Sequence, residues 1–395
     1  MQAGLIVLVL ALAMGLQPVT TDLYLPALPA LTSGFGASMA QAQLTLAALL
    51  LAFGCSQLIW GPLSDRFGRK PILLVGLSSY VLAAIGCVLS SSMDMLIVWR
   101  TVQGAALGAS VMCARAIVRD LYTPAQGARV MSRALTGLGI IACLSPPLGG
   151  LVSDLLNWRA ALAVLALFGA VTLGLVCLRF EETLTRKNPQ ALRPGVLVGN
   201  WLLIARHPTF WSFALLATAS YGGLFTFLAS SSFVFIDVLG LSKTLYGFLM
   251  FTMALAYVGG TVLCRRLLAR FGVRGTVAIA GALSLSGGLL VGGLAWAGWR
   301  NGWAIMLPFY LFMLGHGINQ PCGQSGAIAP FPQAAGAASA LSGFLMMGVA
   351  FAMGSWLGRH MDGTVLPLTM GVCFWGVVVS TVAWIGVQRY GEPAH

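Results

Sequence analysis

The stretch GPLSDRFGRK, residues 61–70, is a short charged segment between two long apolar runs. Its centre returns 204 positions later, where residues 270–274 read RFGVR and again follow a long apolar run. A repeated joint between apolar runs indicates a chain built from two similar halves. The second copy has Ala269 where the first has Asp65, so a polar contact made by Asp65 would have no counterpart there.

The composition around this joint is that of a membrane protein. The 395 residues are 58% hydrophobic and 8% charged, with a mean hydropathy of +0.89, whereas soluble domains carry about 25% charged residues. A spanning helix needs about 20 apolar residues, and a backbone in lipid must satisfy its own hydrogen bonds. The sequence therefore predicts an all-α integral membrane protein with twelve spans, at 4–30, 41–62, 71–91, 94–118, 128–152, 158–179, 209–235, 245–267, 275–297, 303–325, 334–358 and 367–389.

The formal net charge of +12 comes from cations in short loops between spans. With both termini placed in the cytoplasm, seventeen of the 22 Lys and Arg residues lie in or beside cytoplasmic segments, four lie outside, and Arg100 lies inside a span. This asymmetry sets the orientation of a multi-pass protein and argues against a nucleic-acid partner. The eight cysteines form no CxxC pair and lie mostly in apolar runs, so we expect neither a disulfide nor a metal site.

The longest polar interval divides the spans into two groups of six. We expect an N-terminal bundle at 1–180, a cytoplasmic linker at 181–208 and a C-terminal bundle at 209–395. Within the linker, GVLVGNWLLIARHP predicts a short interfacial helix. Two six-helix halves related by a repeat are typical of secondary transporters that work by alternating access.

Four motifs, each in the appropriate span or loop, carry a family resemblance. They are TDLYLPALP (21–29), GPLSDRFGRK (61–70), WRTVQGAALGAS (99–110) and LSPPLGG (144–150). The chain resembles the major facilitator superfamily, and within it the drug:proton antiporters of the bicyclomycin-resistance (Bcr/CflA) type, over essentially its whole length. It departs at Ser145, where the exporter motif usually has Gly, and at Met14, where some related exporters carry a second acid.

The resemblance implies the major facilitator fold and a proton-coupled exporter of small amphipathic drugs or metabolites in a bacterial inner membrane. Such a protein is expected to be a monomer in the lipid bilayer, with a small-molecule substrate and no cofactor beyond the proton. The same fold could instead serve proton-coupled uptake of a small metabolite. A membrane-embedded enzyme would need a nucleophile–base pair or a metal cluster, which the lone His316 and scattered cysteines do not offer.

Two charged residues are the candidates for proton coupling. Asp22 is the one acid placed well within a span, where an ionised carboxylate costs at least about 2.5–3.5 kcal/mol. We predict that it carries the proton; the alternative is a structural Asp near the break at Pro26 and Pro29. Arg100 always keeps its charge, so it must be hydrated or paired. We expect it to face the central cavity and tune the proton affinity of the carboxylate, unless it reaches the outer interface.

The candidate gating residues lie in the first joint, in span four and in span five. Asp65 is expected to meet the positive N-terminal end of span eleven and a cation such as Arg115 or Arg119, which would hold the halves shut on the cytoplasmic side. The alternative is that the positive charges of the joint only keep this loop on the cytoplasmic side of the membrane. In span five, prolines and glycines predict a kinked, closely packed helix or ordinary bending. The gating candidates are Gly61, Asp65, Arg66, Gly68, Arg69, Arg115, Arg119, Pro146, Pro147, Gly149 and Gly150.

A polar stripe in span ten is the candidate substrate surface. His316, Asn319 and Gln320 stand at i, i+3 and i+4 of a helix, on a face too polar for lipid. We predict that this stripe and Gln103, which stands three residues after Arg100, line the substrate cavity. For His316 a structural hydrogen bond and a proton-relay role remain equally open.

Overall fold

The computed structural model describes residues 3–122, 124–184, 187, 194–331 and 334–391, and this part of the chain is helical, without strands. Ten of the described helices are long and apolar enough to cross a membrane. The helix α11 (Gly302–Ile328) has the length but is not among them. It contains no Asp, Glu, Lys or Arg, so its polar stripe is what lowers its hydropathy.

All twelve predicted spans are helical in the structure, with ends that differ by a few residues. The segments before residue 206 are α1 (Ala3–Asp22), η1 (Leu25–Ala27), α2 (Leu28–Gly34), α3 (Met39–Phe67), α4 (Arg69–Val88), α5 (Met93–Leu121), α6 (Pro124–Leu155), α7 (Trp158–Arg179) and α8 (Pro194–Ala205). The later segments are α9 (Pro208–Ser232), η2 (Phe233–Val238), α10 (Lys243–Trp296), α11, α12 (Ala335–His360), α13 (Leu366–Thr381), η4 (Val382–Gly386) and α14 (Val387–Tyr390).

Two glycines make the repeated joints. Gly68 separates α3 from α4 with φ 114° and ψ 161°, and Gly272 separates the two legs of α10 with φ 64° and ψ −171°. This region of backbone conformation is essentially open to glycine alone. The repeat RFG therefore encodes the same tight turn in both halves, and α10 comprises the predicted eighth and ninth spans.

Polar caps fix where four of the helices begin. Ser38 and Ser92 accept hydrogen bonds from the main-chain N–H groups of Gln41 and Met95, at the starts of α3 and α5. Asn157 and Asn301 do the same at the starts of α7 and α11. Such side chains satisfy N–H groups that have no partner in the first helical turn.

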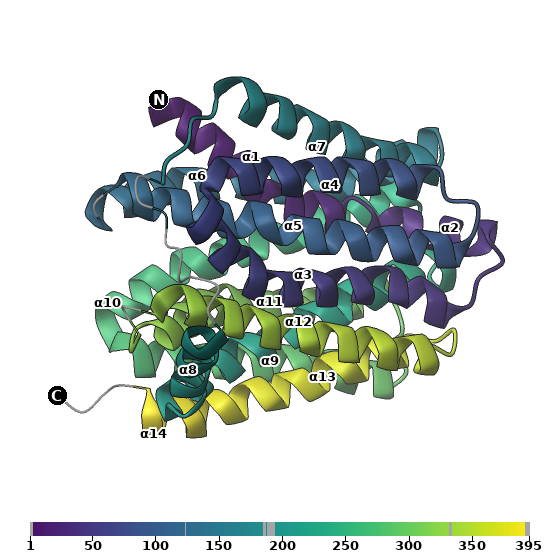
Figure 1. Cartoon of the computed structure of the whole chain (residues 1–395). Helices are drawn as coiled ribbons and strands as arrows, with labels where there is room; N and C mark the ends of the chain where they lie inside the picture. The colour runs from purple at the N-terminus through teal and green to yellow at the C-terminus, as the bar shows by residue number, and fades with distance from the viewer. Residues whose placement is uncertain (1–2, 123, 185–186, 188–193, 332–333, 392–395) are drawn as a thin grey trace. The chain divides into compact units, whose positions relative to one another are not determined.

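The chain divides into two compact units: Met1–Val198 with Lys243–Phe248, and Gly199–Ser242 with Leu249–His395. In the first unit, α5 packs against α3 and α4, and α4 packs against α7 (Figure 1). Glycines permit the closest approach, because a Cβ on Gly104 would overlap the Leu49 carbonyl and one on Gly108 would overlap the Ser56 hydroxyl. The interface between α5 and α3 is therefore built from main chain and small side chains.

The second unit is organised around α9, which contacts α11, α12 and α13. A Cβ on Gly323 of α11 would lie 2.9 Å from the Phe213 carbonyl oxygen, and one on Gly222 of α9 would lie 2.7 Å from the Trp375 ring. These contacts bury an apolar core that includes Phe210, Ile318 and Val379.

Candidate functional site

The first spanning helix stops at the predicted coupling residue. Asp22 is the last residue of α1, and the chain continues through η1 and α2. Its side chain is partly buried and accepts a hydrogen bond from the Thr21 hydroxyl at 2.7 Å. Among the described residues no Lys, Arg or His nitrogen lies within 4.0 Å of the carboxyl oxygens. In this structure, therefore, a hydroxyl and not a cation is the polar partner of Asp22.

Arg100 is fully buried in the first unit. One guanidinium nitrogen donates to Gln103 Oε1 at 2.9 Å, and another donates to the Thr20 carbonyl at 3.0 Å. The guanidinium carbon lies 4.3 Å from the centre of the Tyr24 ring. Nε has no partner among the described residues, and no carboxylate in that part of the chain lies within ion-pair distance. The charge is thus held by an amide, a carbonyl and an aromatic face.

These contacts fix the end of α1 on both sides of Asp22. The Thr20 hydroxyl shares a 2.6 Å hydrogen bond with the Tyr80 hydroxyl, and Tyr24 shares one of 2.9 Å with Thr45. A Cβ on Gly149 of α6 would overlap the Leu23 carbonyl. The span-five glycine therefore allows α6 to lie against the main chain immediately after Asp22.

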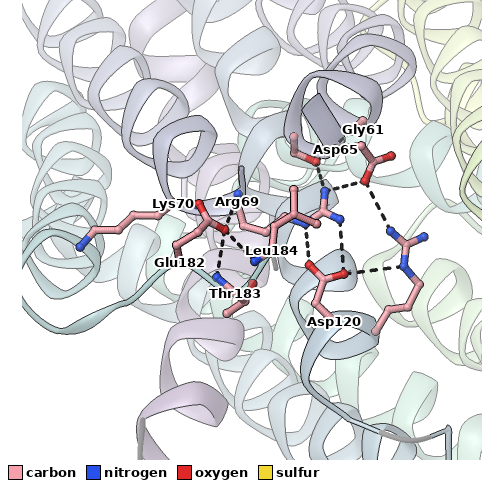
Figure 2. A network of polar contacts seen from close by, with 10 residues as sticks. Gly61, Asp65, Arg69, Lys70, Asp120, Glu182, Thr183 and Leu184 are labelled. Atoms are coloured by element: carbon pink, nitrogen blue, oxygen red, sulfur yellow. Dashed lines mark hydrogen bonds and ion pairs between the residues drawn. The ribbon is translucent and has the colours of Figure 1, made fainter. Parts of the chain in front are cut away.

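The first joint contains a second buried arginine. Arg69 begins α4, and its side chain is 1% exposed. Nη1 lies 2.7 Å from Asp65 Oδ1, and Nε donates to Asp120 Oδ2 at 2.7 Å (Figure 2). Nη1 also donates to the Ser64 hydroxyl at 2.7 Å. The cation therefore links the end of α3, the start of α4 and the end of α5.

Other cations predicted for this joint have different surroundings. Arg119 is 62% exposed and lies 3.5 Å from Asp65 Oδ1 and 4.0 Å from Asp120 Oδ1. Arg115 lies one turn earlier on α5 and is partly buried. Arg66 lies over the ring of Phe67. Among the ion pairs that Arg69 and Arg119 make with Asp65 and Asp120, those of Arg69 are therefore the shortest.

Glu182 completes the joint from beyond α7. Its carboxylate accepts main-chain hydrogen bonds from Arg69 at 2.9 Å and Lys70 at 3.1 Å, and from Thr183 and Leu184, each at 2.9 Å (Figure 2). Burial alone would raise the pKa of Glu182, but these four N–H donors hold it below its usual range. Because the first N–H groups of a helix carry partial positive charge, Glu182 acts as the cap of α4.

Gly68 is required by this cap as well as by its backbone angles. A Cβ added to Gly68 would overlap the carboxylate of Glu182. A Cβ added to Gly61, by contrast, would lie 3.4 Å from Met112, which is an ordinary contact. The Gly61 carbonyl accepts a hydrogen bond from the Ser64 hydroxyl. The two glycines of the joint are therefore not equally constrained.

The proline–glycine motif of α6 contacts the first residues of α10, which belong to the same unit. A Cβ on Gly150 would overlap the Lys243 carbonyl, and one on Gly247 would lie 2.6 Å from the Pro146 carbonyl and 2.8 Å from Pro147 Cα. Nearby, Asp154 Oδ2 accepts from the main-chain N–H of Thr244 at 2.8 Å and from its hydroxyl at 2.6 Å. Asp154, which lies outside the predicted site, thus caps α10 from the end of α6.

The polar stripe of α11 is buried within the second unit. His316 Nδ1 lies 2.8 Å from the Ser220 hydroxyl of α9, and Gln320 Nε2 donates to the Ala217 carbonyl of the same helix at 2.9 Å. Asn319 Nδ2 instead donates to Ser284 of α10 at 3.2 Å. The stripe therefore divides between two neighbouring helices, whereas Gln103 belongs to the first unit and accepts a hydrogen bond from Arg100.

Sequence reasoning missed Asp120 and Glu182. Asp120 adjoins the predicted Arg119, and Glu182 is the second acid of a Glu-Glu pair directly after the sixth span. The available signal was an acid at the end of a span, first beside Arg119 and then after the sixth span. Among the described residues no group of three His, Cys, Asp or Glu side chains could hold a metal ion.

Comparisons with known proteins agree with this architecture. A family model of the Major Facilitator Superfamily matches residues 10–355. The chain is 28% identical over 382 residues to the bicyclomycin resistance protein homolog of Haemophilus influenzae, covering 96% of this chain and 94% of that protein. It is 32% identical over 342 residues to multidrug resistance protein D of Escherichia coli K12, covering 86% and 84%.

Solved structures show the same fold. A crystal structure of a D-xylose–proton symporter matches with a TM-score of 0.76 at 16% identity, covering 99% of both chains. At this identity the likeness concerns the fold alone.

Proposed function

This chain belongs to the major facilitator superfamily, and we propose that it exports small amphipathic compounds in exchange for protons. Asp22 binds a proton when the site opens to the outside and releases it towards the cytoplasm. The compound moves in the opposite direction as the halves alternate. The protein works as a monomer in a bacterial inner membrane, with both termini in the cytoplasm.

The observation that supports this proposal is the setting of Asp22. It is a carboxyl group at the end of a spanning helix, its polar partner is a hydroxyl, and no cation of the described chain pairs with it. A carboxyl in such a place is not held in its charged form by a cation, so it can exist with and without its proton. The relatives that are named for resistance to bicyclomycin and to multiple drugs favour export of drugs.

One proton per cycle releases enough free energy to drive the export of one neutral molecule against a concentration gradient. A proton that crosses about 100 mV releases about 2.3 kcal/mol, and each pH unit adds about 1.4 kcal/mol. Exchange for one neutral molecule therefore supports a concentration gradient of tens-fold or more. Because Met14 stands where some related exporters have a second acid, neutral and zwitterionic compounds are expected to be preferred over strongly cationic ones.

Inverted membrane vesicles from an efflux-deficient host test the direction of transport. With the interior acidified, the proposal predicts that neutral and zwitterionic drugs accumulate inside and that a protonophore abolishes the accumulation. Vesicles carrying the Asp22→Asn variant should show none. Proton-coupled uptake would instead concentrate a compound in right-side-out vesicles under an acidic exterior, and that result would replace the proposal.

A further inference from the structure

Two cysteines from different helices meet in the second unit. Cys264 lies on the first leg of α10 and Cys322 lies on α11, and their Sγ atoms are 3.7 Å apart. Both are free thiols, exposed by only 3% and 4%. The sequence spacing gave no sign of this contact, because 58 residues separate the pair.

The two helices are in close contact one to one and a half turns away from the thiols. A Cβ on Gly260 would overlap the Leu314 carbonyl, and one on Gly317 would overlap the Tyr257 carbonyl. The main chains of α10 and α11 are therefore as close as glycine allows. Cys264 follows Gly260 by one helical turn and Cys322 follows Gly317 by about one and a half turns, so this glycine contact sets the register that brings the sulfurs together.

The surroundings of the pair are apolar. Both cysteines belong to the buried core of this unit, together with Ile318, Phe213 and Ala214. A disulfide is neutral and has no hydrogen-bond donor, so it fits such a core at least as well as two thiols. Pro321 directly precedes Cys322, so a bond at this place would fix α11 where a proline interrupts its hydrogen bonds.

We propose that Cys264 and Cys322 form an oxidisable dithiol, which a hydroperoxide converts into a disulfide that ties α10 to α11. One thiol loses its proton, and its sulfur attacks a peroxide oxygen, breaks the O–O bond and becomes a sulfenic acid. The leaving oxygen takes up that proton and departs as an alcohol, or as water from hydrogen peroxide. The second sulfur then attacks the sulfenic sulfur, and the expelled hydroxide takes the remaining thiol proton as water. Two thiols and one hydroperoxide give one disulfide, one alcohol and one water.

The disulfide also has a functional consequence, which rests on the proposed transport activity. It prevents α10 and α11 from moving past each other beside Gln320, which bonds to α9. Transport by the oxidised protein is therefore expected to fall, and dithiothreitol is expected to restore it.

Thiol counting on the reconstituted full chain tests the proposal. The denatured wild-type chain has eight reactive thiols. After hydrogen peroxide treatment it should have six, with a Cys264–Cys322 cross-linked peptide in the mass spectrum and a monomer on a non-reducing gel. Cys322→Ser starts at seven and should stay at seven. The matched control Cys87→Ser, which removes a buried cysteine of α4, starts at seven and should fall to five.

The outcomes separate the site from its consequence. If wild type and Cys322→Ser lose the same number of thiols, or if the cross-linked peptide is absent, the dithiol site is wrong. Cys322→Ala repeats the test without introducing a hydroxyl into the core. If the disulfide forms and drug transport is unchanged, the site stands and its effect on transport is refuted. A protein that transports none of the drugs tested still reports on the disulfide.

Discussion

The guanidinium of Arg100 donates to the main-chain carbonyl of Thr20 at 3.0 Å, two residues before the carboxyl group of Asp22. The same guanidinium lies over the ring of Tyr24, two residues after it. Arg100 therefore contacts the chain on both sides of Asp22, whereas no ion pair within the described residues joins it to the carboxylate. We infer that its first task is to position the end of α1.

This arrangement predicts that charge alone cannot replace Arg100. Arg100→Lys keeps the charge but lacks the planar fork that reaches Gln103 and Thr20 together. Arg100→Ala leaves both buried acceptors unpaired, at about 1–3 kcal/mol each. In detergent, the unfolding temperature of Arg100→Ala should lie below that of Arg100→Lys, which should lie below that of wild type. Proton-driven transport should be lost in both variants. Arg266→Lys, at an exposed arginine of α10, is the control. A fully active and stable Arg100→Lys would contradict the positioning role.

The two copies of the repeated joint provide a matched pair of glycine variants. Gly68 and Gly272 share a backbone conformation that strains any other residue, at about 1–3 kcal/mol. At Gly68 the new Cβ would also overlap the Glu182 carboxylate, whereas no atom of the described residues lies within 4 Å of a Cβ at Gly272. Gly68→Ala should therefore lower the unfolding temperature more than Gly272→Ala does. Equal losses would show that the cap by Glu182 adds nothing.

The cap should also make stability depend on pH. The pKa of Glu182 is lower in the folded chain than in the unfolded one, so its stabilising effect is complete above the unfolded value of about 4.3. The effect is lost as the pH falls through the lower, folded value. Glu182→Gln should reduce stability at neutral pH by an amount near the lower end of about 0.5–2 kcal/mol, because the side chain is exposed.

The measurement is the unfolding temperature of wild type and Glu182→Gln from pH 7 to pH 3. The difference between them should shrink as the pH falls. A difference that stays constant over this range would mean that the carboxylate charge does not cap α4. Glu182→Asp, which keeps the charge on a shorter side chain, is expected to fall between the two.

The break after α1 predicts a loss of transport from one added methyl group in α6. Gly149→Ala would push against the Leu23 carbonyl, next to Asp22. Gly139 lies on the same helix, and within the described part of the chain no atom lies within 4 Å of its Cβ position, so Gly139→Ala is the matched control. We expect transport to fall at least about tenfold, or about 1.4 kcal/mol, in the first variant and to stay near wild type in the second. Similar transport rates in the two variants would contradict a packing role for Gly149.

The spans could be predicted because the bilayer imposes a length and a composition on each one. The recurrence of RFG also marked both joints, where the structure has tight turns with backbone angles that glycine alone tolerates. The end of α1 at Asp22 was harder to place, because the apolar run continues through residues 25–28 and hydropathy does not register the end of one helix within such a run.

The polar contacts of the joint could not be predicted in the same way. Asp65 does lie near Arg119, but its shortest ion pair is with Arg69, which the sequence presented as one of several loop cations. Asp120 and Glu182 reach Arg69 across 51 and 113 residues of chain. Contacts between residues so far apart in the sequence depend on how α4, α5 and α7 pack. No local sequence pattern predicts that packing. The meeting of Cys264 and Cys322 was hidden for the same reason.

The central claim is that Asp22 carries the proton, and reconstituted vesicles test it most directly when two kinds of transport are compared. Asp22→Asn should still exchange labelled drug for unlabelled drug across the membrane without a pH gradient, because the asparagine is a nearly isosteric substitute for the protonated acid. The variant should no longer concentrate drug when a pH gradient is imposed, and addition of drug should no longer release protons. Drug accumulation driven by the pH gradient at the wild-type level in Asp22→Asn would contradict the account.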